Sequence, residues 1–329
     1  SSGYFNGTID DVRIFDRVLT AEQIKLFFEN DTRTLYSGET IIGDNWTVSV
    51  TSTDTIAETA ASTSNHLIIN SRVFCGDTIT TSKTMDANIT ACSGTAITIG
   101  ASNIVLDCND YSIIGDSYGT DVEYGINIEN YNNITIIDCD VHGFTKGINA
   151  VNVSILNITG GNYSDNGPDQ DTDNDNDGFN LFLDNVDDFT INNIIISNPT
   201  ESLDGGGGGG GGEGSAYGIR VDNSTSGRIN NITGNPINYD IGGSVYGLFI
   251  KDGLKINVTN SNLGPNWTEG IHYENITYGF INYNDIISKS ESILLTESSF
   301  INITNNNFNS SGSYTLFFDK STNNYVINN

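Results

Sequence analysis

The chain has 329 residues, 41 of them acidic and 13 basic, which gives a formal net charge of −28. A surface this acidic repels nucleic acid and anionic membranes, so we expect neither as a partner. Disorder is the usual alternative for such a composition, but an aromatic content of 10% and periodic apolar runs argue against it. No apolar run is long enough to predict a membrane-spanning segment.

Residues 4–30 read as strand, turn, strand and helix. Thr20 is the predicted cap of a helix over residues 21–30, and Gln23 closes a capping box. This stretch resembles the closing segment of a laminin-G/concanavalin A-like sandwich, which implies a terminal piece of such a domain over residues 1–35. The resemblance implies no lectin activity, because the sugar-binding loops are absent. The chain begins inside the motif without a recognisable signal peptide, so we expect a piece of a longer protein.

Residues 36–71 contain two strand-like runs, at 39–50 and 66–70, separated by a stretch rich in Thr and Ser. This segment is similar to the last strands of an immunoglobulin-like module, although it is too short to be one. A bare linker is the alternative interpretation. Two module ends in succession predict a mosaic surface protein.

From about residue 100 one pattern recurs: a small residue, alternating apolar positions, Asn or Asp, and a second alternating run. The units begin at residues 125, 147, 178, 218, 247, 270, 292 and 315. Most are therefore about 22 residues long, and insertions lengthen the others. Repetition at such a period is typical of a solenoid.

Alternation of apolar and polar residues indicates strands with one buried face. Ile, Val, Phe, Thr and Tyr dominate these runs, while Asn, Asp and Gly, which accept left-handed backbone geometry, separate them. Stacked at about 4.8 Å, successive units complete one another's hydrogen bonds around one apolar column. A helical solenoid needs helical periodicity, which no segment after residue 35 shows. The sequence therefore predicts an all-β fold, a right-handed parallel β-helix of about nine or ten coils over residues 72–329.

The stretch from Cys75 to Cys108 resembles the opening coils of NosD-like right-handed β-helix repeat domains in surface proteins of archaea and some bacteria. The wider family includes carbohydrate-active members. The resemblance implies the fold far more strongly than a function, because lyases, hydrolases, epimerases, adhesins and fibres share it.

Four cysteines fit an oxidising compartment. Cys75 and Cys92 flank one opening coil, so we expect them to be paired. Cys108 and Cys139 end equivalent strands of neighbouring coils, and the stacking distance suits a disulfide. Two stacked free thiols are the alternative for this second pair.

An acidic loop runs from Asp169 to Gly178, and its alternating carboxylates predict a Ca²⁺ site. The calcium-loop positions 1, 3, 5, 7 and 12 fall on Asp173, Asp175, Asp177, the Phe179 carbonyl and Asp184, with Asp171 as a further candidate ligand. Asp at position 12 departs from the usual Glu. A solvated acidic loop is the alternative. The run Gly205–Gly212 lies in the longest insertion and predicts a flexible loop. Alternatively, the eight glycines replace residues whose identity was not determined.

The chain carries 15 Asn-x-Ser/Thr sequons, and we expect about half to be glycosylated if the protein is secreted by a host with that machinery. The candidates are Asn266 and Asn309, in apparent loops, followed by Asn45, Asn88, Asn162 and Asn223.

Little in the sequence predicts catalysis. His66, His142 and His272 are isolated and are predicted to be surface or turn residues. The sequence therefore lacks the clustered histidines that a zinc site or a Ser-His-Asp triad would need. Carboxylate pairs such as Asp138 with Asp140 are expected by chance in so acidic a chain.

We therefore interpret the chain as an extracellular structural or adhesive β-helix module of a cell-surface or filament-forming protein, such as an S-layer component or adhesin. It is expected to be calcium-stabilised and glycosylated. The expected partners are further copies of itself, in a head-to-tail assembly, and an extracellular polysaccharide or another cell's surface. The alternative is a polysaccharide lyase or glycoside hydrolase acting in the solenoid groove.

Overall fold

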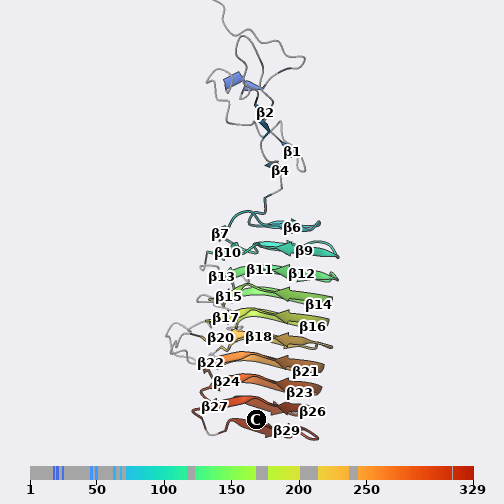
Figure 1. Ribbon diagram of the computed structural model, residues 1–329, viewed down its shortest axis with the longest axis vertical. Coiled ribbons are helices and arrows are strands. Elements are labelled where there is room, and N and C mark those ends of the chain that lie inside the picture. Colours follow the sequence, from blue (N-terminus) through green and yellow to red (C-terminus); the bar gives the residue numbers. More distant parts are fainter. Residues whose placement is uncertain are drawn as a thin grey trace, which may run out of the picture. The chain divides into compact units, whose positions relative to one another are not determined.

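The computed structural model describes residues 72–116, 123–167, 177–200, 214–236, 244–312 and 314–329, with a few short pieces nearer the N-terminus. The chain divides into two units, Ser1–Ser71 and Arg72–Asn329 (Figure 1). The Gly205–Gly212 run and the acidic loop before Asp177 lie outside the described residues.

In the first unit, Ala21, Ile24 and Lys25 are helical, and the Ile24 N–H donates to the Thr20 carbonyl at 3.1 Å. The rest of the predicted helix lies outside the described residues. Two short antiparallel pairs follow. They are β1 (Asn45–Trp46) with β4 (Leu67–Ile68), and β2 (Ser49–Val50) with β3 (Ser62–Thr63).

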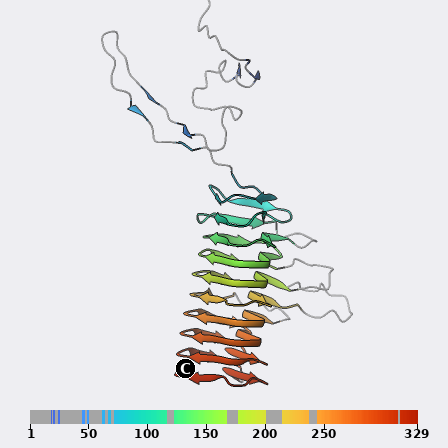
Figure 2. The same cartoon turned by 90° about the vertical axis from the view of Figure 1, so that its right-hand side faces the viewer.

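The second unit is the predicted parallel β-helix, in which each coil contributes strands to three walls (Figures 1 and 2). The first wall contains ten strands: β5 (Asp77–Ile79), β8 (Ile97–Ile99), β11 (Tyr124–Glu129), β14 (Lys146–Thr159), β16 (Gly178–Asn192), β18 (Ala216–Asp222), β21 (Val245–Thr259), β23 (Glu269–Asn282), β25 (Ile293–Thr296) and β28 (Leu316–Asp319). The second wall contains β6 (Lys83–Thr84), β9 (Ile104–Asp107), β12 (Ile134–Ile137), β19 (Arg228–Asn230), β26 (Ser299–Thr304), β29 (Tyr325–Ile327) and the C-terminal parts of β14, β16, β21 and β23. The third wall contains β7 (Ile89–Cys92), β10 (Ser112–Gly115), β13 (Asp140–His142), β15 (Asn162–Ser164), β17 (Ile195–Ser197), β20 (Thr233–Gly234), β22 (Asn262–Trp267), β24 (Asp285–Ser288) and β27 (Asn307–Ser310).

The core is a set of inward-facing columns, as the alternating pattern predicts. Along the first wall one column lies at the same register in successive coils and consists of Ile97, Ile126, Ile148, Leu181, Ile219, Leu248, Ile271 and Ile293. All eight side chains are fully buried. Burial of a Leu or Ile side chain stabilises a fold by roughly 1.5–3 kcal/mol, so these columns provide a large share of the stability.

The coils bend at positions where the backbone takes a left-handed conformation. The bend that ends the first wall is formed in successive coils by Asn130, Asn152, Asn185, Asn223, Asp252, Asn275, Glu297 and Lys320, with φ between 49° and 62°. The bend that begins the second wall is formed by Asn103, Asn133, Ile155, Asp188, Ser226, Lys255, Tyr278, Phe300 and Asn323. Asn and Asp tolerate this conformation better than other non-glycine residues, which explains much of the chain's asparagine content.

Asparagine side chains also link the coils through hydrogen bonds. Asn284 donates from Nδ2 to Asn306 Oδ1 at 3.0 Å, and Asn306 donates to Asn329 Oδ1 at 2.8 Å. Asn284 and Asn306 are buried, and each also donates to a main-chain carbonyl. Such ladders satisfy polar groups that would otherwise destabilise the interior.

Candidate functional site

The predicted calcium ligands are only partly described. Asp171, Asp173 and Asp175 lie outside the described residues. Asp177 Oδ1 accepts a hydrogen bond from the Ser215 main-chain N–H at 2.7 Å, and Oδ2 lies 3.4 Å from Arg220 Nη1.

Asp184 does not close a loop around Asp177. The chain between them runs as strand β16, which at roughly 3.3 Å per residue separates the two residues by about 20 Å. Asp184 Oδ1 instead accepts from Asn223 Nδ2 at 2.8 Å. Among the described residues no group of three or more His, Cys, Asp or Glu side chains could hold a metal ion. Asp184 is therefore too far away to complete the loop, while a Ca²⁺ site formed by Asp171, Asp173, Asp175, Asp177 and the Phe179 carbonyl stays a prediction.

The repeat unit around Gly178 is shifted by two residues from its predicted phase. The strand register pairs Phe179 with Lys146 and Tyr217, so Asn180 rather than Gly178 takes the place of the small residue. Asn180 is fully buried, and its Nδ2 donates to the Ser197 carbonyl at 2.9 Å. Phe179 consequently lies on the outer surface of the first wall instead of in the core.

Five aromatic side chains form a ring cluster on this outer surface, separate from the main core. Its members are Phe179, Phe182, Tyr217, Tyr246 and Phe249. Phe179 stacks on Tyr217 with ring centroids 5.1 Å apart, and Tyr217 stacks on Tyr246 at 5.0 Å. Burial, followed by the charge of Asp177, raises the pKa of Tyr217 to about 12.

Two cations contact the ring cluster. Lys146 Nζ lies 4.1 Å from the ring centre of Phe182, and the Arg220 guanidinium lies 5.0 Å from that of Tyr217. Arg220 also lies 3.0 Å from Asp222. Burial raises the pKa of Asp222, although the hydrogen bond from Arg220 opposes that rise.

Further along the same surface, ionic groups of neighbouring coils meet. Lys251 Nζ lies 2.9 Å from Glu274, directly opposite it in register. His272 is largely buried, with Nδ1 2.9 Å from Glu269 Oε2 but no hydrogen bond between them, and Nε2 3.2 Å from Thr296 Oγ1. The interpretation of His272 as an isolated surface residue is wrong, because coil stacking brings Thr296 beside it.

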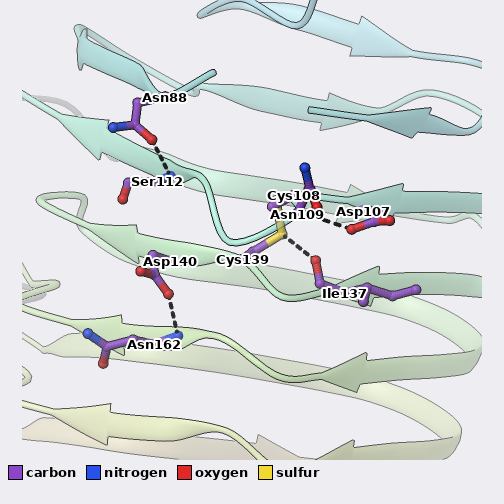
Figure 3. The surroundings of a disulfide bond; sticks show 9 residues. All are labelled: Asn88, Asp107, Cys108, Asn109, Ser112, Ile137, Cys139, Asp140 and Asn162. Carbon is purple, nitrogen blue, oxygen red and sulfur yellow. Dashed lines mark hydrogen bonds between the residues drawn. A yellow bond between two sulfur atoms is a disulfide. The ribbon is translucent and has the colours of Figure 1, made fainter. Parts of the chain in front are cut away.

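Both cysteine pairs are joined, Cys75 to Cys92 and Cys108 to Cys139. Figure 3 shows the second disulfide at the bend between the second and third walls, where it links adjacent coils. Two disulfides indicate an oxidising environment. In the part of the chain that the structure describes, no helix is long and apolar enough to cross a membrane.

The sequon residues predicted to lie in loops are in strands. Asn309 is an exposed residue of β27, while Asn266 lies in β22 and donates from Nδ2 to the Pro236 carbonyl at 2.7 Å. Asn88 and Asn223 are exposed, and Asn162 is half-buried. The side chain of Asn45 lies outside the described residues. Asn266, whose Nδ2 would carry the glycan, is thus less available than Asn309.

No known protein family matches the chain, and no curated protein matches it. Among solved structures, the A-module of the mannuronan C-5 epimerase AlgE4 from Azotobacter vinelandii is similar, with a TM-score of 0.45 and 13% identity over 75% of this chain and 76% of that one. ORF18 of Geobacillus virus E2 has a TM-score of 0.33 and 11% identity, and the match covers 77% of this chain and 54% of that protein. At these identities the similarity concerns the fold alone. The chain is thus a parallel β-helix protein with two disulfides.

Proposed function

We propose that the chain is an extracellular structural and adhesive module of a cell-surface protein. The observation that carries this proposal is the stack of ten first-wall strands, each paired in parallel with the next through the described part of residues 72–329. At about 4.8 Å per coil the stack is a rod of roughly 45 Å. Buried asparagine ladders and an inter-coil disulfide support it as a stiff spacer.

The paired charges of the first wall favour a structural role for that surface. Arg220 contacts Asp177 and Asp222, and Lys251 contacts Glu274 in the next coil. Charges that neutralise one another across coils contribute to coil stacking and leave fewer groups available for proton transfer.

Calcium and glycans belong to the same proposal. The carboxylates of Asp171, Asp173 and Asp175 repel one another unless a counter-ion binds, which supports Ca²⁺ as the ligand of that loop. Asn309 and Asn88 are exposed sequon residues and the best-placed glycan acceptors, whereas Nδ2 of Asn223 donates to Asp184. Head-to-tail self-association stays a prediction, for which the mass of the purified protein in solution is the test.

Antibody labelling of intact source cells, combined with electron microscopy of the purified protein, tests the proposal. We expect labelling without permeabilisation and short rods in the images. Labelling that requires permeabilisation, or the absence of rods, would contradict it.

A second candidate function is cleavage of a polysaccharide, by elimination or hydrolysis, on the first wall. It is favoured by the convergence of His272 and Glu269 on Tyr246, a member of the ring cluster, with the Tyr246 and His272 ring centres 6.2 Å apart. Incubation with a panel of polysaccharides, followed by measurement of new reducing ends and unsaturated products, is the test. His272→Ala should abolish any activity and Lys320→Gln should not. No product from any polymer would eliminate this candidate.

A further inference from the structure

The outer surface of the second wall carries a groove that the proposed function does not explain. Two adjoining hollows of about 420 and 320 Å³ share Asn257 and Phe280. The first is lined by Thr190, Asn192, Arg228, Asn230, Asn257, Thr259, Phe280 and Asn282. The second adds Lys255, Tyr278, Gly279, Phe300 and Asn302. Together they extend across the strands from β16 to β26.

The groove follows from the strand register. In successive coils the same outward position is taken by Thr190, Arg228, Asn257, Phe280 and Asn302. A parallel row, two residues further along each strand, consists of Asn192, Asn230, Thr259, Asn282 and Thr304. Two rows at a spacing of about 4.8 Å create a long surface of amides and hydroxyls that suits an extended, hydroxyl-rich polymer.

Aromatic rings border these rows and are open to solvent. Tyr278, Phe280 and Phe300 are 48, 49 and 44% exposed, and the rings of Tyr278 and Phe300 stack with centroids 5.0 Å apart. Adjacent exposed rings on a soluble protein commonly mark a binding surface.

Three groove residues occupy an unfavourable backbone conformation. Lys255, Tyr278 and Phe300 form the same bend in consecutive coils, with φ of 58°, 62° and 58°. Asn or Asp stands at this bend in four of the other coils, at Asn103, Asn133, Asp188 and Asn323, while Ile155 and Ser226 stand there in the remaining two. A non-glycine residue held there costs roughly 1–3 kcal/mol. The fold does not need a cation and two aromatic rings at this bend, so their presence points to a ligand.

The groove is also electrostatically distinct. Residues 72–329 contain nine basic residues. Four of them, Arg72, Arg220, Lys251 and Lys320, form ion pairs, and Lys83, Lys146 and Lys289 also have interaction partners. The side chains of Arg228 and Lys255 are exposed and form no hydrogen bond or ion pair within the described part of the chain. No carboxylate lines either hollow. In a chain of net charge −28, two unpaired cations in a groove free of acidic side chains favour an anionic ligand.

We infer that this groove binds an acidic polysaccharide. Arg228 and Lys255 hold its carboxylate or sulfate groups, the Asn and Thr rows bond its hydroxyls, and the exposed rings pack against its sugar rings. Nucleic acid presents similar anionic groups, but it offers few free hydroxyls to the Asn and Thr rows, so a polysaccharide is the better match. The inference rests on the adhesive part of the proposed function and gives it a site.

Binding is measured by isothermal titration calorimetry of the whole chain at low and moderate salt. The probes are polygalacturonate, dextran sulfate, neutral dextran and a single-stranded oligonucleotide. We expect salt-sensitive binding of polygalacturonate, dextran sulfate or both. The polymer that binds more tightly identifies carboxylate or sulfate as the preferred anionic group. Arg228→Gln with Lys255→Gln should weaken it by about tenfold or more, equivalent to about 1.4 kcal/mol. Lys320→Gln, on the first wall, is the matched control and should leave affinity unchanged.

Tyr278→Asn separates binding from folding. Because Asn tolerates the left-handed bend, this variant should melt at the same temperature or higher while binding more weakly. Unchanged affinity in the double variant, or equal affinity for the oligonucleotide, would overturn the inference. Binding of neutral dextran alone would overturn it while leaving adhesion standing. Binding of no polymer, together with unlabelled cells, would remove the adhesive function as well.

Discussion

Asn284→Ala tests whether the asparagine ladder stabilises the solenoid. Asn284 is 2% exposed and its side chain makes three hydrogen bonds: Oδ1 accepts from the Ser261 N–H at 2.9 Å, and Nδ2 donates to the Val258 carbonyl at 3.1 Å and to Asn306 Oδ1 at 3.0 Å. At about 1 kcal/mol net for each bond, the truncation should lower the free energy of unfolding by about 3 kcal/mol. The truncation also leaves buried polar groups without hydrogen-bond partners, which adds to the loss of stability.

The assay is equilibrium unfolding in urea, followed by far-ultraviolet circular dichroism. Asn302→Ala is the matched control, because Asn302 lies in the neighbouring coil and its side chain has no hydrogen bond within the described residues. The control should change stability by less than about 0.5 kcal/mol. Equal stabilities of the two variants would refute the reasoning that the buried ladder, rather than the apolar columns alone, holds the coils together.

Three further predictions concern the rest of the β-helix. The double substitution Cys108→Ser with Cys139→Ser should lower the free energy of unfolding by about 4 kcal/mol, because the disulfide closes a separation of 31 residues. Equal stability of the reduced and the oxidised wild-type protein in urea would count against this prediction. Excess chelator should lower the melting temperature of the wild type and not that of Asp175→Ala, and a wild type indifferent to chelator would rule out the Ca²⁺ site. Burial, followed by the negative charges of Asp110 and Asp107, raises the pKa of the Asp138 carboxyl in the folded state. The protonated carboxyl therefore stabilises the fold below the unfolded-state pKa of about 3.9, and this contribution is lost as pH rises through the folded-state pKa. Asp138→Asn should therefore be more stable than the wild type at pH 7, with a difference that shrinks toward pH 3; a constant difference across that range would contradict the assignment.

The sequence predicted the fold because the β-helix is built from a local pattern. Each apolar position in a run such as Ile134-Thr135-Ile136 faces the core by alternation alone, and no distant contact is needed to decide it. The pairing of Cys108 with Cys139 was predictable for the same reason, since both end equivalent strands of adjacent coils.

The phase error at Gly178 shows where local reading fails. Gly178 followed by Phe179 matches the small–apolar opening of other units, but the register places Asn180 at the small position. Asn180 is acceptable there because Asn166 Nδ2 donates to its Oδ1 at 3.1 Å. That partner comes from the preceding coil, so sequence alternation carries no signal of it.

The groove and the first-wall charge pairs were missed for a related reason. Lys251 and Glu274, or Arg228 and Asn257, are distant in sequence and adjacent only once the coil register is known. Because insertions change the coil length, the register cannot be counted from a fixed period. The Asn and Asp residues that end the first wall in six of eight coils, from Asn130 to Asn275, are the sequence signal that could have supplied it.

The bends also change the meaning of the sequons. Asn152, Asn223 and Asn275 occupy one bend, and Asn133 and Asn231 occupy two others, all with positive φ. At these sites asparagine is favoured by the backbone, and the strand that follows favours Thr, so Asn-x-Thr arises from the fold without any selection for a glycan. Several of these side chains already donate to the preceding coil, as Asn152 does to Asn130 at 3.1 Å and Asn275 does to Asp252 at 2.7 Å. Asn309 lies in the middle of strand β27 instead, where the backbone makes no such demand, and is therefore a better indicator of glycosylation than the bend sequons.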